Sequence, residues 1–292
     1  MDLRRTMLFM PGNNPGMLQN GGVLGADSVI LDLEDAVSPQ EKDAARFLVS
    51  QALRFVDYRG SERVVRINSL DTFAAQDIEA IVPCQPDALM VPKVQCAEEI
   101  HEVEQLIAKT EFPGQRPVKI IALIETPRGI AECYPIARAS KRLVALAFGA
   151  EDYTATLGAE RTKEGLEIVT ARSLLVNAAA AAAIQSIDTP FTDVNDFEGL
   201  ARDTAFAKQI GFKGKLTINP RQIDVIHERF NPRQDEIVWA QQVIAAIEQA
   251  KIQGSGVIAL NGKMIDAPIV SRAERTIQLA RRVGLLTEGR EQ

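Results

Sequence analysis

The sequence contains few of the side chains that bind soft metals or form disulfides. Its 292 residues include three cysteines, Cys84, Cys96 and Cys133, and two histidines, His101 and His227. An odd number of cysteines, at spacings unlike those of zinc knuckles, argues against a disulfide framework and a structural zinc site. We expect the cysteines to be inert packing residues and both histidines to lie on helix surfaces.

An excess of positive charge and long apolar runs are also absent. Lysine and arginine number 33 against 39 aspartates and glutamates, a formal net charge of −6, so no basic field favours nucleic acid or an anionic membrane. No apolar run approaches the roughly 20 residues that span a bilayer, and the N-terminal residues lack the apolar stretch of a signal peptide. These features predict a cytoplasmic protein.

Glycine-rich nucleotide-binding motifs of the GxGxxG and Walker types are missing too, which argues against a doubly wound dinucleotide fold. Short apolar runs instead alternate with amphipathic stretches such as 40–56, 97–109 and 166–180, the pattern of a parallel sheet covered by helices. The apolar runs are residues 6–10, 28–33, 64–67, 88–91, 119–124, 143–148, 184–188 and 215–218. Eight such units predict an α/β fold, the (β/α)8 TIM barrel.

The pattern changes after Pro220. We expect residues 1–231 to form the catalytic barrel and 232–292 a C-terminal helical arm. The arm should contain a helix from about 235 to 251, a short hairpin at 257–265 around Asn261 and Gly262, and a final helix to about 283. Because so short a hairpin cannot bury a core alone, the arm is expected to pack on the barrel or on a neighbouring subunit.

Polar residues follow the predicted strands, where a (β/α)8 barrel has its active site. Carboxylates outnumber cations there, and clustered like charges repel one another unless a cation lies among them. Mg²⁺ would fit, since it takes oxygen ligands including one or two carboxylates. The best pair is Glu125 and Asp152, on adjacent strands; the alternative is a carboxylate rim without metal. The strand-end residues are Asp32, Glu34, Asp35, Arg66, Asn68, Lys93, Glu125, Arg128, Glu151, Asp152, Asp188, Asn219 and Arg221.

Two of these carboxylates have alternative interpretations. Glu34 and Asp35 could hydrogen-bond metal-bound water or accept a substrate proton, or Asp35 could cap the helix that follows.

Lys93 suggests a Schiff-base aldolase, which needs a lysine with a lowered pKa. Neighbouring carboxylates would raise that pKa instead, so we reject this function for Lys93.

The turn at Pro11 and Gly12 is a candidate anion-binding site. Glycine lets a phosphate approach backbone N–H groups, and Arg4 and Arg5 are close in sequence. Phosphate groups of a substrate, or of the molecule that carries it, could be held there. Solvated N-terminal arginines are an equal alternative.

Six motifs together resemble one family. They are RTMLFMPG (5–12), LDLEDAV (31–37), VRIN (65–68), ALIETPRG (122–129), FGAEDY (148–153) and NGKMID (261–266). In this order, over nearly the whole chain, they are similar to the citrate lyase β-subunit family, part of the wider group of citryl-CoA, malyl-CoA and citramalyl-CoA lyases. One departure is Asn219 before Pro220, where many relatives have histidine.

The resemblance implies a (β/α)8 barrel with a C-terminal arm and assigns roles to single residues. Glu125 and Asp152 match the Mg²⁺ ligands, and Arg66 matches the arginine that contacts the α-keto acid. Asp266 matches an arm aspartate that reaches the site of a neighbouring subunit as an acid or base. Without the resemblance, Asp266 would be an ordinary turn residue before Pro268.

The expected function is that of a Mg²⁺-dependent carbon–carbon lyase. It would cleave citryl thioester, on acyl carrier protein or CoA, to oxaloacetate and an acetyl thioester. The resemblance implies work beside citrate lyase α and γ subunits, and we expect a homo-oligomer, a trimer or hexamer. Two alternatives remain: a free-standing malyl-CoA or citramalyl-CoA lyase, and a non-catalytic barrel scaffold subunit.

Overall fold

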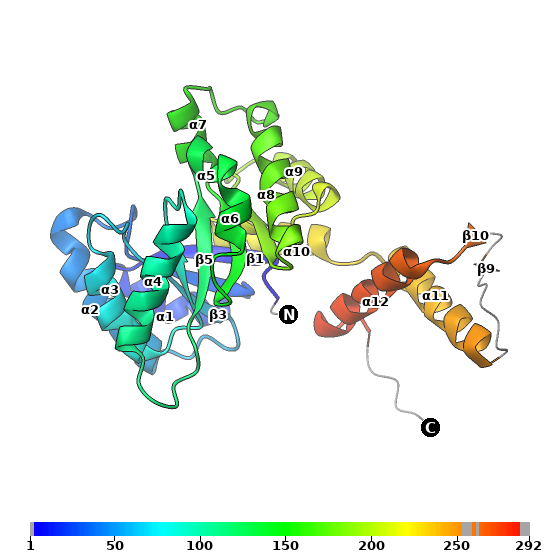
Figure 1. Cartoon of the computed structure of the whole chain (residues 1–292), viewed down its shortest axis with the longest axis horizontal. Helices are drawn as coiled ribbons and strands as arrows, with labels where there is room; N and C mark the ends of the chain where they lie inside the picture. Colours follow the sequence, from blue (N-terminus) through cyan, green and yellow to red (C-terminus); the bar gives the residue numbers. More distant parts are fainter. Residues whose placement is uncertain (1–2, 253–258, 261–262, 287–292) are drawn as a thin grey trace. The chain divides into compact units, whose positions relative to one another are not determined.

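The computed structural model describes residues 3–252, 259–260 and 263–286. Backbone contacts divide the chain into two compact units, Met1–His227 and Glu228–Gln292. The first unit contains all eight predicted strands, and the second contains the C-terminal helices (Figure 1).

Eight parallel strands close into a barrel in the first unit. Each strand pairs with the next in sequence, and β8 closes the ring on β1, with Thr6 opposite Lys215. The predicted TIM barrel is therefore confirmed. The strands are β1 (Thr6–Pro11), β2 (Ser28–Asp32), β3 (Glu62–Arg66), β4 (Ala88–Val91), β5 (Lys119–Ile124), β6 (Leu143–Phe148), β7 (Gln185–Asp188) and β8 (Gly214–Thr217).

Alternate residues of these strands fill the barrel. Phe9 and Val144 pack against this interior cluster. Because successive side chains of a strand point to opposite faces, the intervening residues face the surrounding helices. Since the interior is a packed apolar core, polar chemistry is confined to the barrel ends. The buried interior residues are Met7, Ile30, Val64, Ala88, Met90, Ile121, Leu123, Ala145, Ala147, Ile187 and Leu216.

Helices connect the strands around the barrel, and the amphipathic stretches predicted at 40–56, 97–109 and 166–180 are helical (Figure 1). In α2, for example, Ala45, Val49 and Leu53 are buried along one face. The α-helices are α1 (Pro15–Asn20), α2 (Lys42–Phe55), α3 (Ala74–Ile81), α4 (Ala97–Thr110), α5 (Pro127–Ala131), α6 (Cys133–Ala137), α7 (Ala150–Leu157), α8 (Val169–Ala181), α9 (Phe197–Ile210) and α10 (Ile223–Phe230). Short 3₁₀ turns are η1 (Gly21–Val23), η2 (Pro39–Glu41), η3 (Val82–Cys84), η4 (Leu166–Ile168) and η5 (Pro220–Gln222).

A buried ionic cluster joins β7 and β8 to α8 and α9. Arg172 Nε and Nη2 donate to the two carboxylate oxygens of Asp188 at 2.8 and 2.5 Å. Lys215 Nζ donates to Asp188 at 2.6 Å and to Asp203 at 2.5 Å. Asp188 was expected among the polar strand-end residues at the active-site end, but it faces the helices because its neighbour Ile187 takes the inward position.

The second unit is built around two helices. They are α11 (Gln234–Ile252) and α12 (Ala267–Arg282), close to the predicted helices. Ala240, Val243, Ile265 and Ala273 form their buried apolar cluster. Of the predicted hairpin 257–265, β9 (Ala259–Leu260) and β10 (Lys263–Met264) pair antiparallel, while residues 257–258 and 261–262 lie outside the described residues.

Among the residues that the structure describes, no helix is long and apolar enough to cross a membrane.

Candidate active site

Polar residues from β2, β3, β5 and β6 meet in one pocket at the carboxyl end of the barrel. The pocket has a volume of about 410 Å³. Asp32, Asp35, Arg66, Glu125 and Asp152 all line it. The parallel direction of the strands explains the meeting, because it places every strand end at the same rim.

Arg66, the last residue of β3, is the central cation of this pocket. Its Nε and Nη2 donate to Asp32 Oδ1 and Oδ2 at 2.7 and 2.6 Å, while Nη1 lies 2.8 Å from Glu34 Oε2 and 3.3 Å from Asp35 Oδ2. The Phe9 ring lies under the guanidinium, 4.8 Å from the ring centroid to Cζ. Burial alone would lower the pKa of Arg66, but the hydrogen bonds and charge of Asp32, with Glu34, raise it above its ordinary value.

Glu34 is a buried carboxylate between two cations. Its Oε1 lies 3.0 Å from Lys93 Nζ, on the side opposite the Arg66 contact. Among the described residues, its two buried carboxylate oxygens are contacted by these cations as ion pairs. Burial raises the pKa of Glu34 above its usual range, against the charge of Arg66. Glu34 therefore has the environment of a group that can exchange a proton.

Asp35 is more exposed than Glu34, and its carboxylate lies near the same two cations, Arg66 and Lys93. It accepts a hydrogen bond from Arg66 Nη1 and lies 3.9 Å from Lys93 Nζ. The alternative in which Asp35 caps the following helix is wrong, because Ser38 is the residue that precedes η2, and Glu41 precedes α2. The carboxylate is directed to the cations of the pocket instead.

Glu125 follows β5 and is only 4% exposed. Its Oε1 accepts the backbone N–H of Lys93 at 2.8 Å. Burial raises the pKa of Glu125 to about 8, the negative charges of Glu34 and Asp152 add to that rise, and the Lys93 N–H opposes it. A Cβ added at Gly149 would lie 2.6 Å from Glu125 Oε2, so this position needs glycine for the carboxylate to fit.

Asp152 lies in the first turn of α7, which starts directly after β6. Its charge helps to raise the pKa of Glu125, and both side chains line the same pocket; their role as metal ligands stays a prediction. Among residues 3–252, 259–260 and 263–286 no group of three histidine, cysteine or carboxylate ligands forms a metal site. Two carboxylates whose negative charges oppose each other fit Mg²⁺, which fills its remaining positions with water and substrate oxygens.

The sequence indicated no role for the groups that hold Arg66 and Glu125. Asp32 was recognised only as a strand-end residue, although an aspartate closing the otherwise apolar run SVILD is a signal for a buried partner. Lys93 has a φ of 55°, an uncommon backbone conformation for a residue other than glycine. In this conformation the backbone N–H of Lys93 donates to Glu125, and the Lys93 ammonium forms an ion pair with Glu34.

The turn at Pro11 and Gly12 is not an open backbone cradle. Gly12 N–H donates to the Asp32 carbonyl at 2.8 Å, and a Cβ at Gly12 would lie 2.5 Å from that oxygen. Glycine is needed there because β1 and the end of β2 approach closely. A role of this turn in carrier binding stays a prediction, but the expected Gly12 amide is already occupied.

Arg4 and Arg5 do not assist that turn, because they precede β1 and so lie at the opposite end of the barrel. Arg4 donates to Glu62 at 2.5 and 2.6 Å, and Arg5 donates to Asp27 at 2.7 and 2.8 Å. Because both arginines form these ion pairs, the alternative in which they are solvated is wrong.

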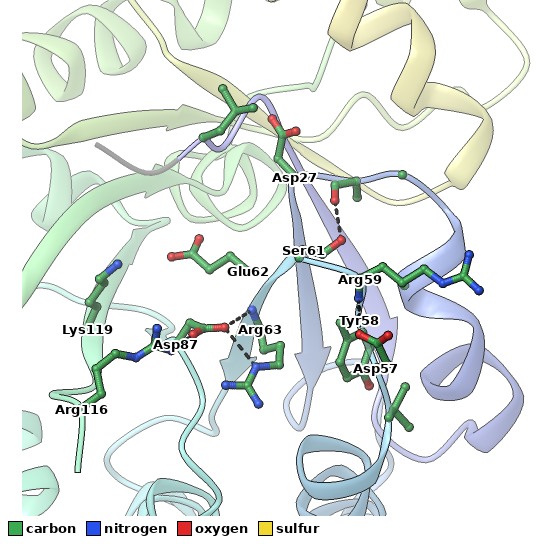
Figure 2. Close-up of a pocket in the computed structure, with 16 residues that line it drawn as sticks. Asp27, Asp57, Tyr58, Arg59, Ser61, Glu62, Arg63, Asp87, Arg116 and Lys119 are labelled. Carbon is green, nitrogen blue, oxygen red and sulfur yellow. Dashed lines mark hydrogen bonds and ion pairs between the residues drawn. The ribbon is translucent and has the colours of Figure 1, made fainter. Parts of the chain in front are cut away.

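A larger cavity, of about 760 Å³, lies at this amino-terminal end (Figure 2). Figure 2 shows Asp87 beside Arg63, which donates to it from N–H and from Nε at 2.8 and 3.1 Å; Arg116 also pairs with Asp87. The acidic groups Asp27, Glu62 and Asp87 are thus paired with arginines. Because (β/α)8 enzymes place their catalytic groups at the carboxyl end, the smaller pocket is the candidate active site.

The histidines lie outside the pocket. His101 is exposed on α4, as expected, and contacts the Ala139 carbonyl. The expectation for His227 was wrong: it is partly buried, its Nε2 lies 2.8 Å from Thr6 Oγ1, and burial lowers its pKa. It packs against the start of β1, far along the barrel from the carboxylates that follow the strands.

Asp266 belongs to the second unit. Its exposed side chain accepts the backbone N–H of Ile269 at 3.1 Å and caps the start of α12. This is the local role of a turn residue before Pro268. A role in catalysis across a subunit boundary stays a prediction.

Known proteins resemble this chain in sequence and in fold. Residues 5–220 match the family model HpcH/HpaI aldolase/citrate lyase. The chain belongs to this family. It is 50% identical to the citrate lyase subunit beta of Leuconostoc mesenteroides subsp. cremoris, over 95% of this chain and 93% of the relative. It is 34% identical to human mitochondrial citramalyl-CoA lyase, over 95% and 85% of the two chains.

A solved structure of the family supports the same fold. CitE from Mycobacterium tuberculosis, determined in complex with magnesium, acetoacetate and coenzyme A, superposes with a TM-score of 0.77 at 32% sequence identity. The superposition covers 96% of this chain and 98% of CitE. The family match includes all eight strands of the barrel and the pocket residues Arg66, Glu125 and Asp152.

Proposed function

We propose that this protein is a Mg²⁺-dependent carbon–carbon lyase that cleaves citryl thioester to oxaloacetate and an acetyl thioester, as the β subunit of citrate lyase. The observation that carries the substrate is its 50% identity to a citrate lyase subunit beta over nearly the whole chain, against 34% to a citramalyl-CoA lyase. The pocket with Arg66, Glu125 and Asp152 supports the reaction type.

The reaction needs three operations on the substrate. A base takes the proton of the tertiary hydroxyl, the C–O bond becomes the ketone of oxaloacetate, and the bond to the thioester α-carbon breaks. The electron pair of that bond forms an enolate, which a proton converts to the acetyl thioester. Positioned acids and bases and fixed positive charge accelerate such steps.

The chain offers a group for each operation. Glu34 and Asp35 are the candidate bases, and Arg66 binds a substrate carboxylate and favours negative charge on the oxygen of the hydroxyl. Asp266, from the arm of a neighbouring subunit, is the candidate donor to the enolate carbon. Glu125 and Asp152 hold Mg²⁺, which when bound supplies Lewis-acid stabilisation of the substrate oxygens.

Partners follow from the same assignment. The thioester is carried by acyl carrier protein or CoA, the α and γ subunits of citrate lyase are the associated chains, and the protein assembles as a homo-oligomer, a trimer or hexamer. The coenzyme A in the related M. tuberculosis structure supports a thioester carrier.

A free-standing malyl-CoA or citramalyl-CoA lyase is the second candidate, favoured by the similarity to the human enzyme. A scaffold subunit without activity is disfavoured, because a scaffold has no need to bury repelling carboxylates such as Glu34 and Glu125 beside each other.

The test is oxaloacetate release from citryl-CoA by the purified protein with Mg²⁺, after EDTA treatment, and after Mg²⁺ is restored. We expect release that EDTA abolishes and Mg²⁺ restores. Glu132→Gln, which changes an exposed carboxylate at the end of α5, is the matched control for Glu125→Gln and should retain activity. No release with Mg²⁺ present, or release that EDTA leaves unchanged, would contradict the proposal.

A further inference from the structure

Asp32 is a buried carboxylate whose acceptor positions are all used. Only 1% of the residue is exposed. Oδ1 accepts Arg66 Nε at 2.7 Å and the Glu34 N–H at 2.9 Å. Oδ2 accepts Arg66 Nη2 at 2.6 Å and the Ala36 N–H at 3.2 Å. One side chain therefore ties the guanidinium of β3 to the loop that follows β2.

This arrangement fixes one edge of the Arg66 guanidinium. Its Nε and Nη2 serve Asp32, and the Phe9 ring covers one face at 4.8 Å. Nη1 is left directed toward Glu34 and Asp35, the carboxylates of the same loop. Since a bidentate contact sets both the position and the plane of a guanidinium, Asp32 determines which hydrogen-bond donors of Arg66 face the pocket.

We propose that Asp32 is a positioning residue, which orients Arg66 toward the substrate carboxylate and holds Glu34 and Asp35 beside it. The inference rests on the proposed function in one respect: the substrate or product must contact Arg66. The four hydrogen bonds of the Asp32 carboxylate go to Arg66 and to the loop backbone, so it has no acceptor position left for substrate or product.

The chain contains a matched control. Asp188 also ends a strand, is also fully buried, and also makes a bidentate pair, with Arg172 Nε and Nη2 at 2.8 and 2.5 Å. This second pair faces α8 and α9, away from the pocket. Asp32→Asn and Asp188→Asn thus each remove a buried charge from a bidentate arginine pair. Asp188 also loses its contact with Lys215, and only Asp32 lies beside a proposed substrate contact.

The experiment is a double-mutant cycle on kcat/KM for citryl-CoA, with Asp32→Asn, Arg66→Lys and the double variant. We expect Asp32→Asn to lower kcat/KM at least tenfold and to weaken oxaloacetate binding by a similar factor. In the Arg66→Lys background the same change should cost less than threefold, because the group that Asp32 orients is already altered. Asp188→Asn should lower Tm while leaving kcat/KM within threefold of the wild type.

Asp32→Glu guards against a variant that does not fold. It keeps the charge but moves the carboxylate by one methylene, and Asp32 borders the pocket, which gives space for it. We expect Asp32→Glu to fold and still to lose most activity. Wild-type kcat/KM in Asp32→Glu or Asp32→Asn, or losses that multiply fully in the double variant, would overturn the proposal.

A measurement without substrate separates this inference from the proposed function. Phenylglyoxal modifies arginine more slowly when a carboxylate holds the guanidinium protonated and shielded, and peptide mapping reads each arginine separately. Arg66 should react several-fold faster in Asp32→Asn than in the wild type, with Arg172 unchanged. If the wild type released no oxaloacetate, the proposed function would fail while this result still decided the placement of Arg66; an unchanged Arg66 rate would overturn the Asp32 proposal.

Discussion

The pocket contains carboxylates that repel one another, and a bound cation would relieve this repulsion. We predict that Glu125→Gln and Asp152→Asn each abolish turnover and weaken Mg²⁺ binding, because each removes a charged ligand. Stability should hold or rise, since the change relieves repulsion and, at Glu125, replaces a buried carboxyl whose charged form burial disfavours. Calorimetric Mg²⁺ titration and thermal unfolding test this; near wild-type activity of either variant would refute the metal assignment.

Arg66 acts through geometry as well as charge. Arg66→Lys keeps a cation but loses the planar fork that meets Asp32 and a substrate carboxylate together. We expect kcat/KM to fall at least tenfold, equivalent to about 1.4 kcal/mol of transition-state binding. Steady-state kinetics with citryl-CoA measure the loss, and an unchanged kcat/KM would assign Arg66 to structure alone.

Sequence patterns predicted which residues line the pocket. They did not predict the contacts that position these residues. Arg66 ends one strand, and Glu125 and Asp152 follow two others, so the parallel barrel brings them together. The Asp32 contacts and the positive φ of Lys93 depend on side chains meeting across strands, which no local pattern encodes. The occupied amide of Gly12 was equally hidden, because it requires the register of β1 on β2.

At the scale of elements, all eight strands were predictable because buried parallel strands are short continuous apolar runs between turn residues. Their facing was harder to assign. Asp188 was placed with the pocket residues, yet Ile187 occupies the interior and Asp188 turns to α8 and α9. Alternation along so short a strand has two phases, and only packing against neighbours selects one.

The buried ionic cluster around Asp188 predicts a dependence of stability on pH. Burial would raise the pKa of Asp188, but the charges and hydrogen bonds of Lys215 and Arg172 lower it to about 2 from 3.8. The folded pKa is below the unfolded value, so this stabilisation is present above about pH 4 and is lost as the pH falls toward 2.

Denaturant unfolding between pH 2 and 6 tests this prediction. The wild type should lose more free energy of unfolding across the window than Asp188→Asn, which has no such group to protonate. Equal losses in the two proteins would show that Asp188 is not stabilised as a charged group.

In the proposed mechanism, Asp266 acts at the barrel of a neighbouring subunit rather than at its own. Asn caps helices as well as Asp does, so Asp266→Asn should retain the start of α12 while removing the titrating group. We predict an inactive but folded variant that still binds oxaloacetate. Circular dichroism and calorimetry check the fold and the binding.

Mixing subunits separates the two arrangements. Asp266→Asn and Glu125→Gln oligomers, each inactive, should regain activity after subunit exchange if the arm of one subunit completes the pocket of another. Verified mixed oligomers that stay inactive would place Asp266 at its own barrel, and a fully active Asp266→Asn would leave it as a helix cap alone.

If this end of the barrel cleaves citryl thioester, the protein should prefer citryl-CoA to related thioesters. The same preparation, with Mg²⁺, is given citryl-CoA, malyl-CoA and citramalyl-CoA, and kcat/KM is taken from the keto acid released. We expect oxaloacetate from citryl-CoA with a kcat/KM at least tenfold above those for the other two. A higher kcat/KM for malyl-CoA or citramalyl-CoA, or no keto acid from any of the three, would contradict it.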